Sequence, residues 1–303
     1  MNEISKHTNE ISKHTNEIAQ NRAEIGYTTP VLLQALLPYR NTNETLITRQ
    51  SGNSFLHIQS ANGIPYGRYV RYIMAYLTSQ AFMRSKDLPE DEARVIPLGN
   101  TFNDFLRFIG LDQKNHKVGG QRVKNIREQL EKLGSLSIVF EEKIPSQERI
   151  KMHSFRIIEE QDFYYGKDPN QGQLFEPHIT LDSSFFKFIK ERGFPFKLDV
   201  FTSLKKPVSM DFYLWATYSV FPYKKLELSW DELQSMFGTQ YRERKDFKKE
   251  FKKAVEEVAE KWTDFQYEFT PNGLTLPAQK PSVTSSETPY NQIRETILKS
   301  LEE

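Results

Sequence analysis

The clearest pattern of apolar and polar positions in the chain lies between Ser229 and Leu276. At its start, Ser229 is suited to cap a helix, Glu232 completes a capping box, and Gly238 ends the helix. Apolar residues then recur at helical spacing, which predicts a second helix with one buried face. These apolar residues are Phe247, Phe251, Ala254, Val255, Val258 and Trp262.

A β-hairpin is predicted directly after this second helix. Aromatic residues alternate with polar ones over residues 265–269, Pro271-Asn272-Gly273 favours a turn, and leucines follow at 274 and 276. Helix, turn, helix and hairpin in this order are typical of a winged helix, a unit that lays its second helix in the DNA major groove. The order of the elements therefore predicts DNA binding.

The charges of the second helix agree with this interpretation. Seven basic and three acidic residues lie between Gln240 and Lys253, a net charge of +4, and Glu256, Glu257 and Glu260 come later. The start of a recognition helix usually meets bases and phosphates, while its far end leaves the groove. A solvated amphipathic helix with Glu–Lys pairs would carry the same charges. The hairpin that follows favours DNA binding.

A similar order of elements is predicted in the first half of the chain. The candidates are a helix over 66–83, a strand over 94–98, a helix over 101–109, a basic helix over 118–133, and strands over 136–141 and 153–158. In the basic helix, an apolar stripe leaves Gln121, Lys124 and Asn125 on the outer face. Glutamine and asparagine side chains can read adenine. The last two strands would form a second, longer wing.

These elements predict an α+β fold with two tandem winged-helix domains. We expect the first domain over residues 45–165 and the second over residues 178–280, joined by a segment rich in glycine and proline. Proline, serine and threonine dominate the sequence from Pro277 to Pro289. Residues 281–303 are therefore expected to form a flexible tail.

Residues 1–30 form a leader with a seven-residue repeat. Ile4, Ile11, Ile18 and Ile25 are one heptad apart, and histidine or asparagine stands three residues after each of the first three. The repeat fits a short trimeric coiled coil with isoleucine and polar layers. It also fits a disordered leader produced by duplication, because so few heptads with a half-polar seam bury little surface.

Composition narrows the function further. The 303 residues include no cysteine, which excludes disulfides, thiolate metal sites and thiol nucleophiles and fits a cytoplasmic setting. The net charge is only +1, so attraction to DNA must come from local basic patches. No apolar run approaches the roughly 20 residues of a membrane span, and we expect no membrane association.

We expect no catalysis. Some DNA-nicking enzymes attack with a tyrosine, and Tyr164 and Tyr165 form a candidate pair. Such nucleases bind a metal through closely spaced histidines, and the six histidines of this chain include no His-x-His. The chain also has no phosphate-binding loop of the form G-x-x-x-x-G-K-[ST]. Catalytic residues, metal sites and cofactors are therefore all predicted to be absent.

Six longer blocks carry a further signal. Those in the first half are GIPYGRYVRYIMAYLTSQA (63–81), IPLGNTFNDFLRFIGL (96–111) and VGGQRVKNIREQLEKL (118–133). Those in the second half are SLKKPVSMDFYLWATY (203–218), SWDELQSMFG (229–238) and YRERKDFKKEFKKAV (241–255). Together they resemble the RepA-type plasmid replication initiators, a group of iteron-binding proteins that includes TrfA-like members. The resemblance spans about residues 45–281.

The resemblance implies a plasmid replication initiator. Such a protein binds repeated double-stranded DNA sites (iterons) at the origin, promotes opening of AT-rich duplex, and recruits the host initiator and the helicase or its loader. The resemblance also implies self-association into dimers, with the first domain involved, and residues 4–25 would allow higher assemblies.

The same resemblance places the DNA contacts. The main, second-domain contact falls on Tyr241, Arg242, Arg244, Lys245, Lys248, Lys249, Lys252 and Lys253, with Asn272 at the tip of the hairpin. Arg242 and Arg244 are the candidates for guanine contacts. The first domain would add Gln121, Arg122, Lys124 and Asn125.

Two other functions fit the same elements. A winged-helix transcriptional repressor or autoregulator would recognise its DNA in the same way without opening the origin. A structural or adaptor protein would show no salt-sensitive DNA affinity. Opening of AT-rich duplex beside the bound repeats separates the initiator from the repressor.

Overall fold

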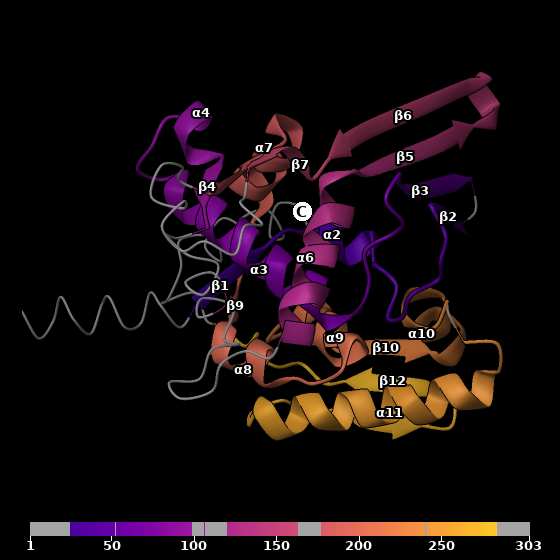
Figure 1. Cartoon of the computed structure of the whole chain (residues 1–303). Helices are drawn as coiled ribbons and strands as arrows, with labels where there is room; N and C mark the ends of the chain where they lie inside the picture. Colours follow the sequence, from indigo (N-terminus) through magenta and orange to yellow (C-terminus); the bar gives the residue numbers. More distant parts are fainter. Residues whose placement is uncertain are drawn as a thin grey trace, which may run out of the picture.

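The computed structural model of the chain describes residues 25–51, 53–98, 106, 120–162, 177–239 and 241–283 (Figure 1). These residues form helices and antiparallel strands, which confirms the mixed α+β class predicted from the sequence. The heptad repeat up to residue 24, most of the helix predicted over 101–109, and the connection over 163–176 lie outside the described residues. Among the helices described, none has the length and apolar character needed to span a membrane.

The second half of the chain contains the predicted helix, turn, helix and hairpin. Its elements are α9 (Pro207–Ser219), β10 (Leu226–Ser229), α10 (Trp230–Phe237), α11 (Arg244–Lys261), β11 (Glu268–Thr270) and β12 (Gly273–Leu276). The predicted capping box is confirmed: the Ser229 hydroxyl accepts from the Glu232 backbone N–H at 3.2 Å, and the Glu232 carboxylate accepts from the Ser229 backbone N–H at 2.8 Å. Strand β10 was not predicted. It pairs with β12, which gives the antiparallel order β10-β12-β11.

The apolar stripe of α11 is buried, as its spacing predicts. Phe251 on α11 meets Phe212 on α9 and Phe237 on α10, with ring centroids 5.3 and 5.4 Å away. Edge-to-face and offset contacts of this kind add to the free energy gained by burial. This packing fixes the rotation of α11 about its axis and leaves its basic residues on the outer side.

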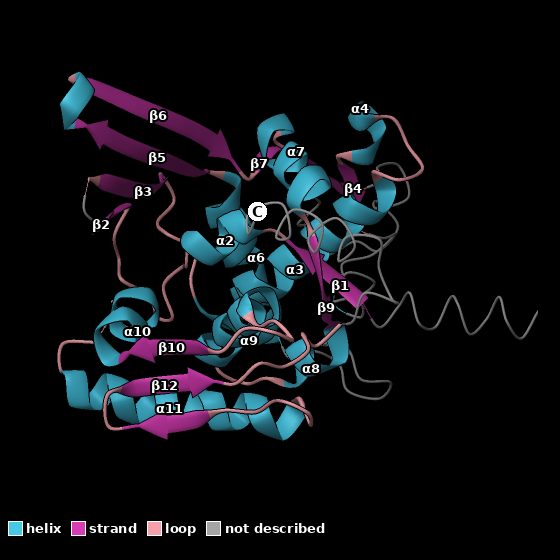
Figure 2. Cartoon of the chain, turned by 180° about the vertical axis from the view of Figure 1, so that it is seen from behind, coloured by secondary structure: helices cyan, strands magenta, loops and turns pink. Residues whose placement is uncertain are grey.

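The first half combines helices with a four-stranded sheet. Its elements are β2 (Leu46–Ser51), β3 (Ser54–Ser60), α3 (Gly67–Arg84), α4 (Glu90–Ala93), β4 (Val95–Pro97), α6 (Gly120–Gly134), β5 (Leu136–Ile144), the 3-10 turn η1 (Pro145–Gln147), β6 (Arg149–Arg156) and β7 (Ile158–Asp162). The predicted hairpin β5–β6 is present, and its far end extends beyond the helices (Figures 1 and 2). Strands β3 and β2, which were not predicted, extend it to the antiparallel order β2-β3-β5-β6.

Strand pairing joins the two halves. Strand β8 (His178–Leu181), in the predicted second domain, pairs with β4 and β7 of the first. Strand β1 (Ile25–Thr28) pairs with β9 (Phe194–Lys197). The remaining helices are α2 (Pro30–Gln34), α7 (Ser183–Arg192) and α8 (Leu198–Ser203). Because α3 contacts both α7 and α9, one apolar core runs through both halves, and the division into two domains stays a prediction.

A buried ion pair lies where the halves meet. The Arg71 guanidinium on α3 binds both carboxylate oxygens of Asp211 on α9, each at 2.7 Å. It also donates to the carbonyls of Leu37 and Gly67, each at 2.7 Å. The bond to Leu37 ties the segment between α2 and β2 to the centre of the molecule.

The chain after β12 packs against the fold as far as Val283, the third residue of the flexible tail predicted over 281–303, and residues 284–303 lie outside the described residues. The Gln279 side chain accepts from the Gln266 N–H at 2.9 Å and donates to the Gln266 carbonyl at 2.7 Å. The Tyr213 hydroxyl donates to the buried Ser282 hydroxyl at 3.0 Å. These bonds satisfy polar groups that would otherwise be buried without partners, so packed chain continues to Val283.

The end of the predicted leader is also part of the fold. Ile25, the fourth isoleucine of the repeat, is the first residue of β1, and Pro30 is the first residue of α2. Proline is favoured at this position because its missing N–H would have no partner within the helix. The predicted leader over residues 1–30 therefore ends in ordered structure.

Candidate nucleic-acid interface

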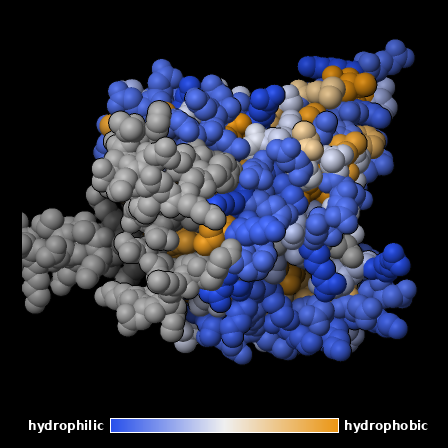
Figure 3. Space-filling model, viewed as in Figure 1, coloured by the Kyte–Doolittle hydropathy of each residue, from blue (hydrophilic) through white to orange (hydrophobic). Residues whose placement is uncertain are grey.

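The residues predicted to contact DNA in the second half lie on α11 and on the turns at its two sides. Helix α11 runs along the lower edge of the molecule, beside the sheet β10-β12-β11 (Figures 1 and 2). Hydrophilic residues cover this edge in the space-filling view (Figure 3). Lys245 and Lys249 are exposed there. In the part of the chain that the structure describes, neither forms an ion pair.

Lys248 and Lys252 lie against an aromatic pair. Trp230, the first residue of α10, stacks with Phe269 of β11 at a centroid distance of 6.1 Å. The Lys248 ammonium lies 4.8 Å from the Trp230 ring centroid, and the Lys252 ammonium lies 5.2 Å from that of Phe269. Aromatic faces attract cations without using their N–H donors. Both ammonium groups therefore have defined positions and keep donors for an acceptor outside the protein.

The same aromatic pair holds the turn of the hairpin against α10. The Trp230 indole N–H donates to the Pro271 carbonyl at 3.2 Å, and the Trp230 backbone N–H donates to the Asn272 carbonyl at 2.9 Å. The Asn272 side chain is exposed at the tip of this turn. The turn, the start of α10 and the flank of α11 that carries Lys248 and Lys252 are thus packed together.

Two of the predicted contact residues already have acidic partners. Arg244 pairs with Asp231 of α10 at 2.9 Å, and Lys253 pairs with Glu250 at 2.9 Å. Hydrogen bonds from Lys253 and then Lys206 lower the pKa of Glu250 below its ordinary value. Arg244 and Lys253 would have to share or exchange these partners to bind phosphates or bases.

The acidic residue Glu257 near the end of α11 has a structural role. Its carboxylate accepts from the Ser209 hydroxyl at 2.5 Å and from the Lys205 backbone N–H at 2.7 Å. Ser209 lies in the first turn of α9, and Lys205 lies two residues before the helix begins. Glu257 is therefore directed toward α9, whereas Glu256 and Glu260 are exposed.

Tyr241 and Arg242 lie in the turn before α11. The Tyr241 ring is half-buried against Phe247, with centroids 5.7 Å apart, and this burial raises its pKa. Arg242 is exposed. Both residues line a cleft between this turn and the segment that precedes β2.

The candidates of the first half lie at the start of α6. The Gln121 side-chain amide donates to the Asn125 side-chain carbonyl at 2.8 Å, so the two amides that were predicted to read adenine bind each other. Arg122 and Lys124 are exposed. Lys132, further along α6, pairs with Glu128 at 2.9 Å and lies over the Tyr66 ring at 4.6 Å.

Sequence reasoning missed two pairs of residues at this surface. It did not assign Trp230, which follows the predicted helix cap, or Phe269, which it placed in the alternating pattern of the hairpin. It also missed Arg40 and Arg49, which lie in a segment without helical periodicity and line one cleft with Tyr241 and Arg242 only in the folded chain. No local pattern could have found these arginines.

Within the described ranges, no group of three or more histidine, aspartate or glutamate side chains is placed so that it could hold a metal ion.

The comparisons with known proteins concern both sequence and fold. The family model described as "Plasmid encoded RepA protein" matches residues 64–232, which is more than half of the chain. A selenomethionine-derivative structure of domains 2 and 3 of RctB is similar, with a TM-score of 0.55 and 12% identity, over 87% of this chain and 98% of that one. A further structure of RctB domains 2 and 3 has a TM-score of 0.46 and 14% identity, over 80% and 94%. At these identities the likeness concerns the fold alone. Among curated proteins, none matches the chain.

Proposed function

The chain belongs to the family of plasmid-encoded RepA proteins, and from this we propose that it initiates plasmid replication by binding repeated double-stranded sites at the origin. The bound protein would then promote opening of the adjacent AT-rich duplex and recruit the host initiator and the helicase or its loader. It would act in the cytoplasm, by assembly rather than catalysis and without a cofactor.

The proposed reader of the DNA sequence is a winged helix formed by α9 to β12. Helix α11 would enter the major groove with its first turns, and the turn between β11 and β12 would follow the backbone beside it. The single observation that carries this proposal is the position of Lys248 and Lys252 over Trp230 and Phe269. Two cations are held there between the helix and the turn, where a winged helix would meet phosphates.

A second winged helix is proposed in the first half, with α6 as its recognition helix and β5–β6 as its wing. Arg122 and Lys124 support phosphate contacts, because both side chains are exposed at the start of α6. Gln121 and Asn125 would exchange their mutual hydrogen bond for bonds to an adenine.

Self-association is proposed through the free edge of β6. Within the described residues β6 pairs only with β5, and it carries the exposed apolar side chains Ile150 and Met152, 59% and 62% accessible. A free antiparallel edge is a template for pairing with a second copy about a two-fold axis. Residues 4–25 would add higher assemblies if their heptads form a coiled coil.

Duplex opening tests the proposed function. A supercoiled plasmid with the origin region is incubated with the full-length protein, and unpaired thymines are detected by permanganate. We expect reactivity in AT-rich sequence beside the repeats, and replication of an origin plasmid that lacks its own initiator gene when the protein is supplied in trans. Binding to the repeats with neither effect would instead establish a repressor.

A further inference from the structure

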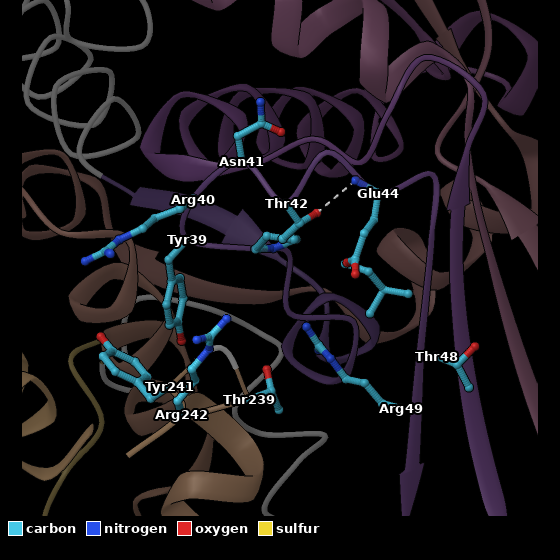
Figure 4. Close-up of a pocket in the computed structure, with 12 residues that line it drawn as sticks. Tyr39, Arg40, Asn41, Thr42, Glu44, Thr48, Arg49, Thr239, Tyr241 and Arg242 are labelled. Carbon is cyan, nitrogen blue, oxygen red and sulfur yellow. Dashed lines mark hydrogen bonds between the residues drawn. The ribbon is translucent and has the colours of Figure 1, made fainter. Parts of the chain in front are cut away.

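A cleft of about 570 Å³ lies at the edge of the proposed winged helix. One wall is the segment between α2 and the middle of β2, and the other is the turn that leads into α11. Tyr39, Arg40, Thr48, Arg49, Tyr241 and Arg242 are among the residues that line it (Figure 4). The cleft therefore lies between a segment of the first half and the start of the proposed recognition helix.

The cleft is basic. Three arginines line it against one acidic residue, Glu44. Arg40, Arg49 and Arg242 form no ion pair with any carboxylate that the structure describes. The buried carboxylate behind the cleft, Asp211, is already bound through both oxygens by Arg71. Asp211 also attracts Arg49 through space, but within the described residues the three arginines of the lining have no direct ion-pair partner.

Among the three arginines, Arg49 has the clearest unused capacity to bind an anion. One of its terminal nitrogens donates to the Leu36 carbonyl, while Nε is buried and has no acceptor within the described residues. Burial lowers the pKa of the Arg49 guanidinium. A half-buried cation without a counter-ion costs stability unless an anion joins it. In Figure 4 the guanidinium of Arg49 points into the space between the two walls.

The walls of the cleft are held in place without a ligand. Arg71 binds the Leu37 carbonyl at 2.7 Å, and the Gly67 N–H donates to the Pro38 carbonyl at 2.9 Å. On the other side, the Tyr241 backbone N–H donates to the Gly238 carbonyl at 2.9 Å. A rigid site loses less entropy when it binds an anion than a mobile one does.

We propose that this cleft binds a phosphate group of the DNA backbone, next to the stretch that α11 reads. Guanidinium groups with nearby hydroxyls suit phosphate, which accepts several hydrogen bonds at once. Because Tyr241 and Arg242 directly precede α11, a strand that passes the start of the helix reaches the cleft. The proposal rests on the proposed function. The proposal adds Arg49 and Arg40, which lie outside the winged helix, as residues that contact DNA. Bound DNA would then contact both residues 38–49 and α11.

The test compares the full-length wild-type protein with two single variants, Arg49→Gln and Arg40→Gln. For each protein, the slope of log affinity against log salt concentration is measured on an origin duplex and on a scrambled duplex. Each variant is expected to flatten the slope by about 0.9 on both duplexes, since one phosphate contact is lost, and to leave the preference for the origin sequence unchanged. Arg49→Lys, which keeps the charge, should retain most of the slope. Arg192→Gln, at the exposed end of α7, should leave the slope unchanged.

The outcomes separate this proposal from the proposed function. If the wild-type protein binds both duplexes without preference, the proposed function fails. If it prefers the origin and both glutamine variants keep the wild-type slope, the cleft proposal is overturned while the proposed function stands. If Arg49→Gln does not fold, the exposed Arg40→Gln decides. A further outcome would also overturn the proposal. Inorganic phosphate or a free nucleotide would stabilise the wild type but not Arg49→Gln, while the salt slope of DNA binding stayed the same in both. The cleft would then be a site for small anions.

Discussion

Arg71 and Asp211 form a bidentate ion pair, with both N–O distances at 2.7 Å, although the two residues lie in different halves of the chain. Both side chains are almost fully buried, at 6% and 7% exposure. Burial raises the pKa of the Asp211 carboxyl, and the Arg71 guanidinium beside it offsets part of that rise. The same guanidinium holds one wall of the basic cleft through the Leu37 carbonyl. The pair therefore links the packing of the two halves to the geometry of the candidate site.

Asp211→Ala is expected to destabilise the protein by about 3–5 kcal/mol, because it leaves the Arg71 charge buried without a partner. Urea unfolding measures the change. The double variant Arg71→Met with Asp211→Leu should cost clearly less, since it removes both charges and keeps apolar volume. A loss below about 1 kcal/mol for Asp211→Ala would show that the pair does not hold the halves together.

Lys248→Ala and Lys252→Ala should each weaken DNA binding and flatten the log–log salt dependence by about 0.9, the effect of one lost phosphate contact. Fluorescence anisotropy with a labelled origin duplex measures both quantities. Lys248→Arg is the matched control that keeps both the charge and the contact with Trp230. Lys261→Ala, at the last residue of α11, should bind as the wild type does. Unchanged slopes in both alanine variants would reject a phosphate role for these lysines.

Ser229→Ala removes the side-chain cap of α10 and is expected to cost about 1 kcal/mol in the free energy of unfolding. Because the cap also positions Trp230, the variant should weaken DNA binding modestly without changing the salt slope. Chemical unfolding and anisotropy measure the two effects. No change in stability would show that the capping box is not formed in solution.

The capping box also predicts a pH dependence. Hydrogen bonds from the Ser229 side chain and then its backbone N–H lower the pKa of Glu232 below its ordinary value of 4.5. Stability that comes from a lowered pKa is present above 4.5 and is lost as the pH falls through the folded-state pKa. The difference in melting temperature between wild type and Glu232→Ala should therefore be present at pH 7 and shrink below about pH 4.

Gly273→Ala should disrupt the sheet β10-β12-β11. A Cβ atom at this position would lie 1.7 Å from the Leu228 carbonyl oxygen, and backbone atoms cannot yield as a flexible side chain can. We expect a loss of about 3 kcal/mol or more, or failure to fold, in thermal and urea unfolding. Pro271→Ala in the same turn, where the side chain is exposed, should cost less than about 1 kcal/mol. Equal stabilities of the two variants would contradict the close approach of β10 and β12.

Much of the second half could be predicted from local patterns. Ser229 and Glu232 specify the start of α10 because a capping box uses only neighbouring residues. The apolar stripe from Phe247 to Trp262 specifies the buried face of α11 because side chains three or four residues apart share one face of a helix. Gly273 was predicted as a turn residue, whereas the structure requires it for a close backbone approach to β10.

The remaining features of the fold and of the site depend on contacts between residues that lie far apart in the sequence. Strand β3 pairs with β5, from Ser54 opposite Glu142 to Ser60 opposite Leu136, and no local window contains both strands. For the same reason, the sequence could not predict the ion pair of Arg71 with Asp211 or the position of Arg49 and Arg242 in one cleft. Helical spacing could place basic residues on the surface of α11, but it could not show that Arg244 and Lys253 bind acidic neighbours while Lys248 and Lys252 lie over aromatic rings.

The measurement that tests the central claim most directly is a salt titration of DNA binding by the full-length protein, which compares a fragment from the plasmid's own origin region with a scrambled fragment of the same length and composition. We predict preferential, stepwise binding of the origin fragment, one step for each repeat, with affinity that falls linearly on a log–log scale as salt rises. Equal affinity for both fragments at every salt concentration would contradict the assignment of α11 as the reader of repeated origin sites.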